Sequence, residues 1–493
     1  MNMKNINKYL YLILLGSFTA CTYDFPEEVI QEPTAGEANF TKMISVGNSL
    51  TAGFMDGALY TRSQDNSFAV ILSDQMVPVG GGAFNVPNIN SVNGFFGLAP
   101  DGQTPLGRLI LTVNPQTGAT GPAPIGLGEI PTAFTGDKSA LNNFGVSGST
   151  LLTSLIPQTG GPNVPQNPAF NPLYARFASN PGESTIIGDA AAALGNGGTF
   201  FTFWLGSNDV LGYALGGASN PAILTSNINF EQRLSLALGT MLQANPEAKG
   251  AVANIPNLNV LPYFNLVPWN ALPLDQGTAA FVNQAYLQYN GGLAQLAGMG
   301  LITEAEKTRR TIVFKAGQNG FVMADKNLTD LTGFGLPSIR QSNNTDKPVL
   351  TLSTALGVAV GGNPQLVRGV SFPVEDSFVL TQMEQEESQA KITAFNALIA
   401  AAVQASSNRL VLVDVNNFLN QVLQGQVNAG GASLTASIIP PNGGFSVDGV
   451  HPNARSHAFI ANLFIDAINA KWGANIPKSN PNAYPGNDLP VGG

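Results

Sequence analysis

The chain is poor in cysteine and histidine, and this scarcity narrows the chemistry open to it. Its 493 residues include one cysteine and two histidines. A single cysteine forms no disulfide within the chain, and no His-Glu-x-x-His pattern is present, so the common zinc sites lack their ligands. The glycine-rich stretch at 80–82 is not followed by Lys-Ser or Lys-Thr, and no Gly-x-Gly-x-x-Gly spacing occurs. We therefore expect no metal, no nucleotide and no other cofactor.

Charged side chains are also scarce. They make up 11% of the chain, against about 25% in an average soluble protein. The net charge is −9, and no cluster of Lys and Arg occurs, which excludes the electrostatic footprint of a nucleic-acid-binding protein. The difference is made up by 55 glycines, 33 prolines and many asparagines, which predicts long ordered loops.

The N-terminus has the pattern of an export signal. Lys4 and Lys8 precede an apolar run at 10–20 that is too short to span a membrane, and the run ends at Cys21. The sequence Phe18-Thr19-Ala20-Cys21 resembles a bacterial lipobox, with Phe18 where an aliphatic residue is usual. This resemblance implies cleavage of residues 1–20 and acylation of Cys21. The stretch after it is polar, acidic and interrupted by prolines, so we expect 21–40 to comprise the lipidated cysteine and an acidic tether. We expect a lipid-anchored outer-membrane protein of a Gram-negative bacterium, with surface exposure as one option. The alternative is an ordinary signal peptide followed by a chance cysteine.

Short apolar runs alternate with helical patterns along the rest of the chain. This alternation predicts a three-layer α/β/α sandwich, in which helices cover both faces of a central, mostly parallel sheet. Dense Gly, Pro and Asn predict loops through most of 61–141, long enough to wall a cleft, and a loose tail after Gly473. The expected strands are 43–46, 140–144, 199–205, 250–255 and 409–415, and the expected helices are 230–244, one capped by Thr381 and Glu384, and 454–472.

The sequence pattern changes between about 264 and 373, and this segment divides the core in two. We expect the first part at 41–263, an inserted cap at 264–373, the second part at 374–473 and a flexible tail at 474–493. Within the cap, the sequence predicts a helix at 279–296 and a hairpin of 311–315 with 320–325.

A serine follows the first expected strand. In parallel sheets, sites form at the carboxyl ends of the strands, which is where Ser49 lies in the sequence. A serine hydroxyl becomes a nucleophile only with a base beside it. Of the two histidines, His451 has Asp448 three residues before it, where a carboxylate can orient the imidazole. We take His457, inside the last expected helix, as a structural surface residue.

Four short blocks, in this order, resemble the SGNH (GDSL-type) serine hydrolase family. They are Gly47-Asn48-Ser49-Leu50, the stretch from Asn143 to Thr150, Gly206-Ser207-Asn208-Asp209 and Asp448-Gly449-Val450-His451-Pro452. The resemblance covers about 41–262 and 371–472. Asn48 stands where the family usually has Asp.

The resemblance implies an esterase or lipase of flavodoxin-like fold that acts on a small-molecule or lipid ester. Ser49 would attack the ester carbonyl, His451 would act as the base and Asp448 would orient it. The N–H groups of Ser49 and Gly148 and the side chain of Asn208 would hold the oxyanion. Two alternatives stay open: a carbohydrate or peptidoglycan O-acetyl esterase, and a surface lipoprotein that binds a ligand without catalysis.

Overall fold

The computed structural model describes residues 32–115, 118–429 and 431–492. The expected signal peptide and Cys21 lie outside these ranges. The residues from Thr34 to Gly493 form one compact unit. The predicted tether extends too far along the chain, because Glu37 N donates to Trp472 O at 2.8 Å and the buried Phe40 ring lies 5.1 Å from that of Phe200. The residues just before 41 are therefore part of the body.

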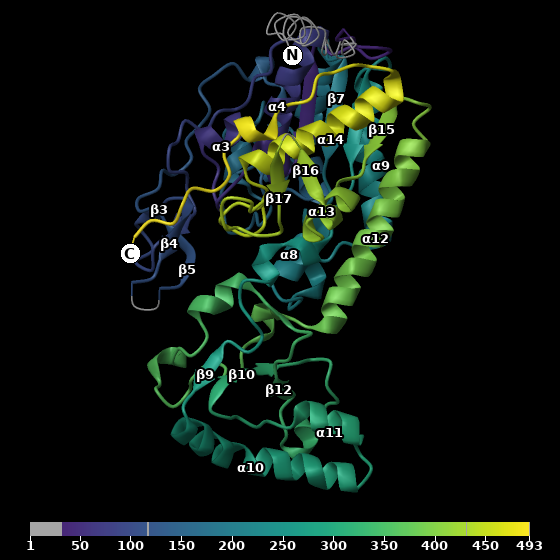
Figure 1. The fold of residues 1–493 in the computed structure, drawn as a ribbon. Helices are drawn as coiled ribbons and strands as arrows, with labels where there is room; N and C mark the ends of the chain where they lie inside the picture. Colours follow the sequence, from purple (N-terminus) through teal and green to yellow (C-terminus); the bar gives the residue numbers. More distant parts are fainter. Residues whose placement is uncertain (1–31, 116–117, 430, 493) are drawn as a thin grey trace, which may run out of the picture. The chain divides into compact units, whose positions relative to one another are not determined.

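A five-stranded parallel sheet forms the centre of this unit (Figure 1). Its inner strands are almost wholly buried, as expected for apolar strands covered on both faces. The predictions of these strands are confirmed, with the ends shifted by a few residues. The strands are β1 (Met43–Gly47), β6 (Asn143–Gly145), β7 (Phe200–Trp204), β8 (Lys249–Ala253) and β15 (Leu410–Val413).

The strand order creates a natural place for a site. Across the sheet the order is β15-β8-β7-β1-β6. Read from the β6 edge, with the five strands numbered along the chain, this order is 2-1-3-4-5. It is the order of flavodoxin-like doubly wound sheets. The connections leave in opposite directions at the border between β1 and β7, so a crevice opens there at the carboxyl ends of the strands.

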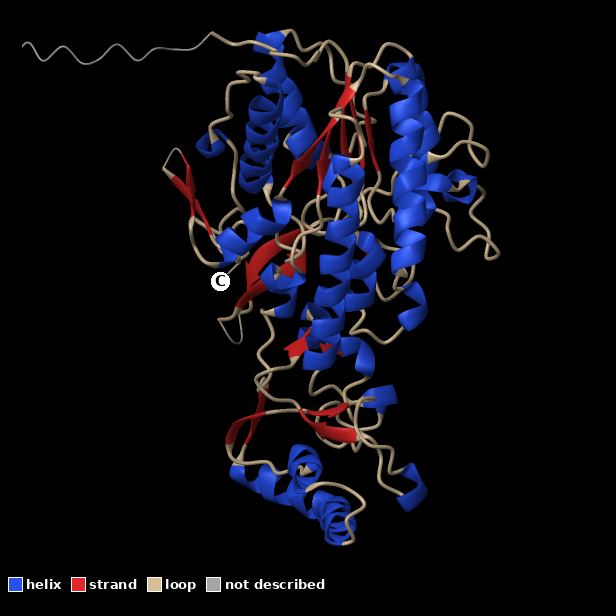
Figure 2. Cartoon of the chain, turned by 90° about the vertical axis from the view of Figure 1, so that its right-hand side faces the viewer, coloured by secondary structure: helices blue, strands red, loops and turns tan. Residues whose placement is uncertain are grey.

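Helices lie on both sides of the sheet (Figure 2). On one side, α14 (Ala454–Trp472) contacts β8 and β15 and packs on α4 (Phe68–Met76). On the other side, α7 (Ile186–Gly195) contacts β1 and β6 and packs on α9 (Asn227–Ala244), which in turn packs on α12 (Gln382–Gln404). The fold is therefore α/β with a parallel central sheet, compatible with a three-layer α/β/α arrangement.

The capping signals in the sequence place the helix ends well. Thr381 and Glu384 form the predicted capping box of α12, with Thr381 N donating to the Glu384 carboxylate at 2.8 Å. The predicted bounds of α14 are also confirmed. Asn453 caps its start, and Gly473 ends it with a φ of 61°, a conformation that favours glycine.

Two helices of the core were not predicted: α4 lies where only loops were expected, and α7 lies in a region for which no helix was expected. Six of the nine residues of α4 are buried, so the helix has no wide polar face to mark its period. In α7 the repeat is hidden because four alanines stand in a row before Leu194. The short helix α3 (Thr61–Asp65) was missed as well. The prediction of loops from residue 61 onward is therefore wrong as far as residue 79.

Residues 272–379 contain a second hydrophobic cluster. Its helices are α10 (Gln276–Gly298) and α11 (Glu304–Arg310). Two small sheets accompany them, one of β9 (Leu272–Leu274) with β10 (Gly317–Asn319) and one of β11 (Val322–Ala324) with β12 (Ile339–Gln341). The expected insertion thus has a core of its own.

The hairpin predicted within this insertion is wrong. Residues 311–315 form no strand, because two asparagines of α10 bind their backbone groups instead. Asn290 accepts from Ile312 N at 3.0 Å and donates to Ile312 O at 2.8 Å, and Asn283 makes the same pair with Phe314 at 2.8 and 2.9 Å. These side-chain bonds take the place of a partner strand.

The remaining strands form four small antiparallel pairs. They are β2 (Gly97–Leu98) with β3 (Pro105–Leu106), β4 (Leu109–Val113) with β5 (Thr120–Pro124), β13 (Lys347–Pro348) with β14 (Val379–Leu380), and β16 (Val427–Ala429) with β17 (Ala432–Leu434). The prediction of a loose tail after Gly473 is wrong, because residues as far along as Val491 are hydrogen-bonded to the body. Ser479 N donates to Asn462 Oδ1 at 2.8 Å and Val491 N to Leu111 O at 3.0 Å.

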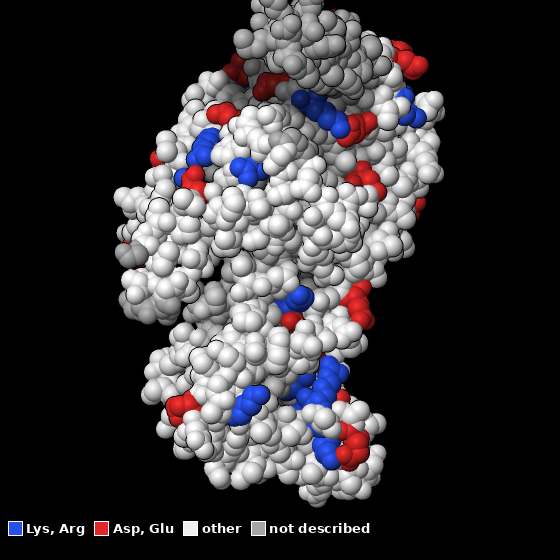
Figure 3. All heavy atoms as spheres, in the orientation of Figure 1, with Lys and Arg blue, Asp and Glu red and all other residues white. Residues whose placement is uncertain are grey.

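Charged residues are sparse on the face shown in Figure 3, as the composition implies. Within the described ranges, none of the helices has both the length and the apolar character that a bilayer span requires.

Candidate active site

The turn after β1 delivers Ser49 into a very tight space. Ser49 begins α2 (Ser49–Ala52), and the Asn48 side chain caps this helix by accepting from Leu50 N at 3.0 Å. Asn caps a helix as well as Asp does. Asn48 therefore still makes this contact, although the SGNH pattern usually has Asp at this position. A Cβ on Gly47 would lie 2.0 Å from Thr51 Oγ1. Only glycine therefore lets the chain turn here.

The loops after β1, β6 and β7 start side by side. Gly47 is paired with Gly145 on one side and with Trp204 on the other. A Cβ on Gly145 would lie 2.3 Å from Ala52 N, so glycine also allows the close approach of α2. The three sequence blocks that follow these strands consequently meet at one edge of the sheet.

Asn208 and Asp209 tie the second block to the third. Asn208 begins α8 (Asn208–Leu215), and its Nδ2 donates to Ser149 O at 2.9 Å. The buried Asp209 accepts from Leu151 N and Thr225 Oγ1, each at 2.9 Å. Burial raises the pKa of Asp209 to about 6, although these hydrogen bonds oppose the shift. Asp209 fixes the start of α5 (Leu151–Leu155), next to Gly148, whose φ is 79°.

His451 is held by Asp448. The His451 Nδ1 lies 2.8 Å from Asp448 Oδ2, while Asp448 Oδ1 accepts from the N–H groups of Val450 and His451 at 2.8 and 2.9 Å. Burial alone would raise the pKa of Asp448, but the charge of His451 and these hydrogen bonds hold it at about 2. The carboxylate is therefore ionised at neutral pH and favours a proton on Nδ1, which leaves Nε2 for chemistry.

Ser49, Asn208 and His451 line a single pocket with a free volume of about 40 Å³. No hydrogen bond joins the Ser49 hydroxyl to the His451 ring in the described chain; in ligand-free enzymes such bonds are often long and tighten with substrate. The rest of the lining is mostly apolar, and it includes Leu50, Trp204, Leu211, Ile255, Leu258, Leu261, Leu419 and Val450.

None of these lining residues comes from the loops at 61–141 or from the insertion at 264–373. The expectation that the loops at 61–141 wall the cleft is therefore wrong for this pocket, and the insertion does not line it either. Its walls are the segments that follow β1, β7 and β8, the segment at 445–452 and α13 (Val415–Leu423).

Two backbone N–H groups near Ser49 are unpaired in the described chain. They belong to Ser49 and Gly148, and neither finds an acceptor. Asn208 uses one of its two amide hydrogens on Ser149 O, so the other is open. Gly148 is not part of the pocket lining, but the Asn208–Ser149 bond holds its neighbour beside Asn208.

The loop that supports Asp448 is a part of the site that was not predicted from the sequence. Phe54 places its ring 5.0 Å from that of His451, and Gly57 N donates to Asp448 Oδ2 at 2.8 Å. These residues directly follow the turn that carries Ser49. The Asp56-Gly57 pair is a typical turn signal and could have marked the loop.

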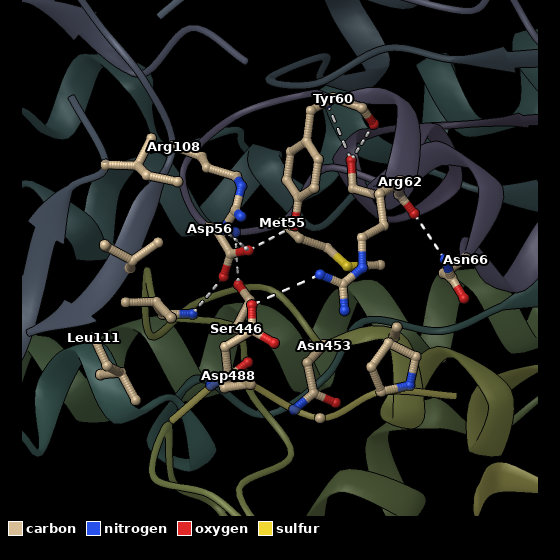
Figure 4. A pocket seen from close by; sticks show the side chains of 18 of the residues that line it. Met55, Asp56, Tyr60, Arg62, Asn66, Arg108, Leu111, Ser446, Asn453 and Asp488 are labelled. Carbon is tan, nitrogen blue, oxygen red and sulfur yellow. Dashed lines mark hydrogen bonds and ion pairs between the residues drawn. The ribbon is translucent and has the colours of Figure 1, made fainter. Parts of the chain in front are cut away.

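Asp56 fastens this loop to the segment before Asp448 (Figure 4). Its N donates to Ser446 Oγ at 3.0 Å, and its carboxylate accepts from Val447 N at 2.9 Å and from Tyr60 OH at 2.6 Å. Burial raises the pKa of Asp56, against the lowering by its hydrogen bonds. The backbone of Asp56 has a φ of 55°, which non-glycine residues adopt rarely.

His457 is a buried residue, so its placement at the surface is wrong. Its Nδ1 accepts from Phe68 N at 3.1 Å, and its ring is stacked on that of Phe68. Burial, followed by the charge of His451, lowers the pKa of His457 to about 3. His457 is therefore neutral and enclosed in the core, and His451 has no competitor as a base.

No cluster of three or more His, Cys, Asp or Glu side chains suited to a metal ion occurs in the described ranges. Comparison of the sequence with protein-family profiles finds no match, and comparison with curated proteins finds none either. The features that indicate a function are therefore the geometry of the pocket and the resemblance of the four blocks.

Proposed function

We propose that the chain is a serine esterase of the SGNH type that hydrolyses small apolar carboxylic esters. One observation carries this proposal: Ser49, Asn208 and His451, which lie up to 402 positions apart in the sequence (451 − 49), line the same pocket. They lie at the carboxyl edge of a parallel sheet, by the border between β1 and β7, where such sheets bind ligands.

The mechanism follows from these positions. Ser49 Oγ attacks the ester carbonyl while His451 Nε2 takes its proton, and Asp448 stabilises the imidazolium that forms. The negative charge on the tetrahedral oxygen is balanced by the unpaired N–H groups of Ser49 and Gly148 and by the open amide hydrogen of Asn208. His451 then returns the proton to the leaving alcohol. Water cleaves the acyl-enzyme by the same steps.

The pocket itself favours short chains. A volume of about 40 Å³ has room for roughly three water-sized groups, since one water needs about 10–15 Å³ of such space. Deeply buried residues, among them Trp204, Ile255 and Leu261, form part of its wall. Enlargement would therefore disturb the core. An acyl chain of about four carbons fits, which favours an esterase over a lipase for long chains.

Labelling with a fluorophosphonate tests the nucleophile. We expect the wild-type protein to be labelled and Ser49→Ala to remain unlabelled, with Ser154→Ala, a buried serine outside the pocket, as the matched control. Equal labelling of wild type and Ser49→Ala would remove Ser49 from its proposed role. No labelling of either protein would favour the non-catalytic alternative.

Asn208→Ala tests the oxyanion site. Removal of one such donor typically lowers kcat about 100- to 1000-fold, with little change in KM. Because Asn208 Nδ2 also binds Ser149 O, the melting temperature of the variant should be measured beside the kinetics. A stable Asn208→Ala protein with unchanged kcat would contradict the assignment.

We further propose that the esterase is a lipoprotein anchored through Cys21 in the outer membrane, on the strength of the lipobox-like sequence alone. Metabolic labelling with palmitate should mark the wild-type protein and leave Cys21→Ser unmarked. Equal labelling of both would refute the anchor.

A further inference from the structure

A second cavity lies behind the loop that supports Asp448, and nothing in the proposed mechanism uses it (Figure 4). Its volume is about 180 Å³, enough for a small organic molecule. The walls come from four parts of the chain: residues 55–66, which include α3; β4 with residues 108 and 125 beside β4 and β5; residues 446–454; and the tail at 485–491. The packed tail thus closes one side of the cavity.

The guanidinium groups of two arginines face this cavity, and neither group donates a hydrogen bond within the described chain. Arg108 Nη1 lies 3.7 Å from Asp56 Oδ2, and Arg62 Nη1 lies 3.7 Å from Asp488 Oδ2, so both contacts are ion pairs beyond hydrogen-bond distance. The side chain of Arg108 is only 15% exposed, and its Nε is fully buried without a partner. Buried donors in this state are rare, because each costs the full free energy of its desolvation.

One of the two carboxylates that line the cavity is already occupied. Asp56 already accepts from Tyr60 OH and Val447 N. Asp488, which is 64% exposed, can turn toward solvent. The unmet capacity is thus mainly that of a donor: each guanidinium offers five N–H groups, arranged to bind a carboxylate or phosphate through two parallel bonds. An ammonium ligand would have to compete with these two guanidinium groups for the carboxylates of Asp56 and Asp488.

We propose that this cavity binds a small organic anion, with its oxyanion group on Arg108 and Arg62 and a short apolar body against Met55, Leu111 and Ile125. These apolar residues line the same cavity as the two arginines. The site is distinct from the pocket of Ser49, and its occupancy does not depend on hydrolysis.

Calorimetric titration of the full-length protein with butyrate tests the proposal, with butyramide and butylammonium as neutral and cationic matches. We expect butyrate to bind with a dissociation constant on the order of 1 mM, as is reasonable for a ligand of six heavy atoms. Butyramide and butylammonium should bind at least 10-fold more weakly. Equal binding of butyramide, preference for butylammonium, or no binding of butyrate up to about 30 mM would overturn the assignment.

Variants locate the binding. Arg108→Met keeps an unbranched stem but removes the guanidinium and its donors, so it should weaken butyrate binding at least 10-fold, whereas Arg233→Met, outside the cavity, should match the wild type. If Arg108→Met fails to fold, Arg62→Met replaces it, because Arg62 is 53% exposed and tolerates change. Unaltered affinity in the folded arginine variant would refute the proposal, whether or not Ser49 proves to be a nucleophile.

Discussion

The buried state of His457 should dominate the acid sensitivity of the fold. In the folded protein its pKa is about 3, against about 6.5 in an unfolded chain. The unfolded state therefore binds one more proton between these values, so stability falls as the pH falls through this window. The slope for one proton is about 1.4 kcal/mol per pH unit, and from pH 6.5 to pH 4 the loss amounts to about 3 kcal/mol.

His457→Asn isolates this contribution. The Asn side chain can still accept from Phe68 N, the partner of His457 Nδ1, but it does not titrate. Urea unfolding of both proteins between pH 4 and pH 7, each referred to its own value at pH 7, should show the wild type losing about 3 kcal/mol more than the variant. Parallel curves would refute the reasoning and mean that His457 is protonated in the folded state.

Three further outcomes follow from the site. The pKa of Asp448 is lowered to about 2, so its carboxylate stabilises the fold by about 2 kcal/mol above pH 4, and this stability is lost as the pH falls to 2. The free energy of unfolding of Asp448→Asn should not show this loss between pH 4 and pH 2. Asp56→Ala removes the contacts to Val447 and Tyr60 and should lower kcat about 10-fold at unchanged KM, whereas Tyr60→Phe should keep most of the activity. Equal kcat in the wild type and both variants would exclude a positioning role for Asp56. On p-nitrophenyl esters, butyrate should be cleaved at least 10-fold faster than octanoate, and the reverse order would show that the pocket beside Ser49 does not bind the acyl chain.

The sequence predicted most of the elements that place the candidate site. Runs such as 199–205 have no polar face, so they are recognisable as buried strands, and the pairing of Gly47 with Gly145 and Trp204 then follows from a parallel sheet. The capping residues of α12 and α14 were equally readable, because a cap is a local interaction between neighbours in sequence.

What escaped prediction depends on contacts between distant residues. The hairpin failed because Asn283 and Asn290 on α10 take the backbone groups of 312 and 314. The burial of His457 depends on α4, a helix whose apolar surface hides its period. The support of Asp448 by Gly57 joins residues 391 positions apart, and no pattern within either segment specifies that meeting.

The inserted segment has a consequence for how this protein could change over evolutionary time. It enters after β8, leaves before α12, and brings its own cluster of apolar side chains. It contributes nothing to the lining of the pocket of Ser49. Substitutions there can alter one region of the protein surface without touching the residues that line this pocket, so the two regions are free to diversify separately.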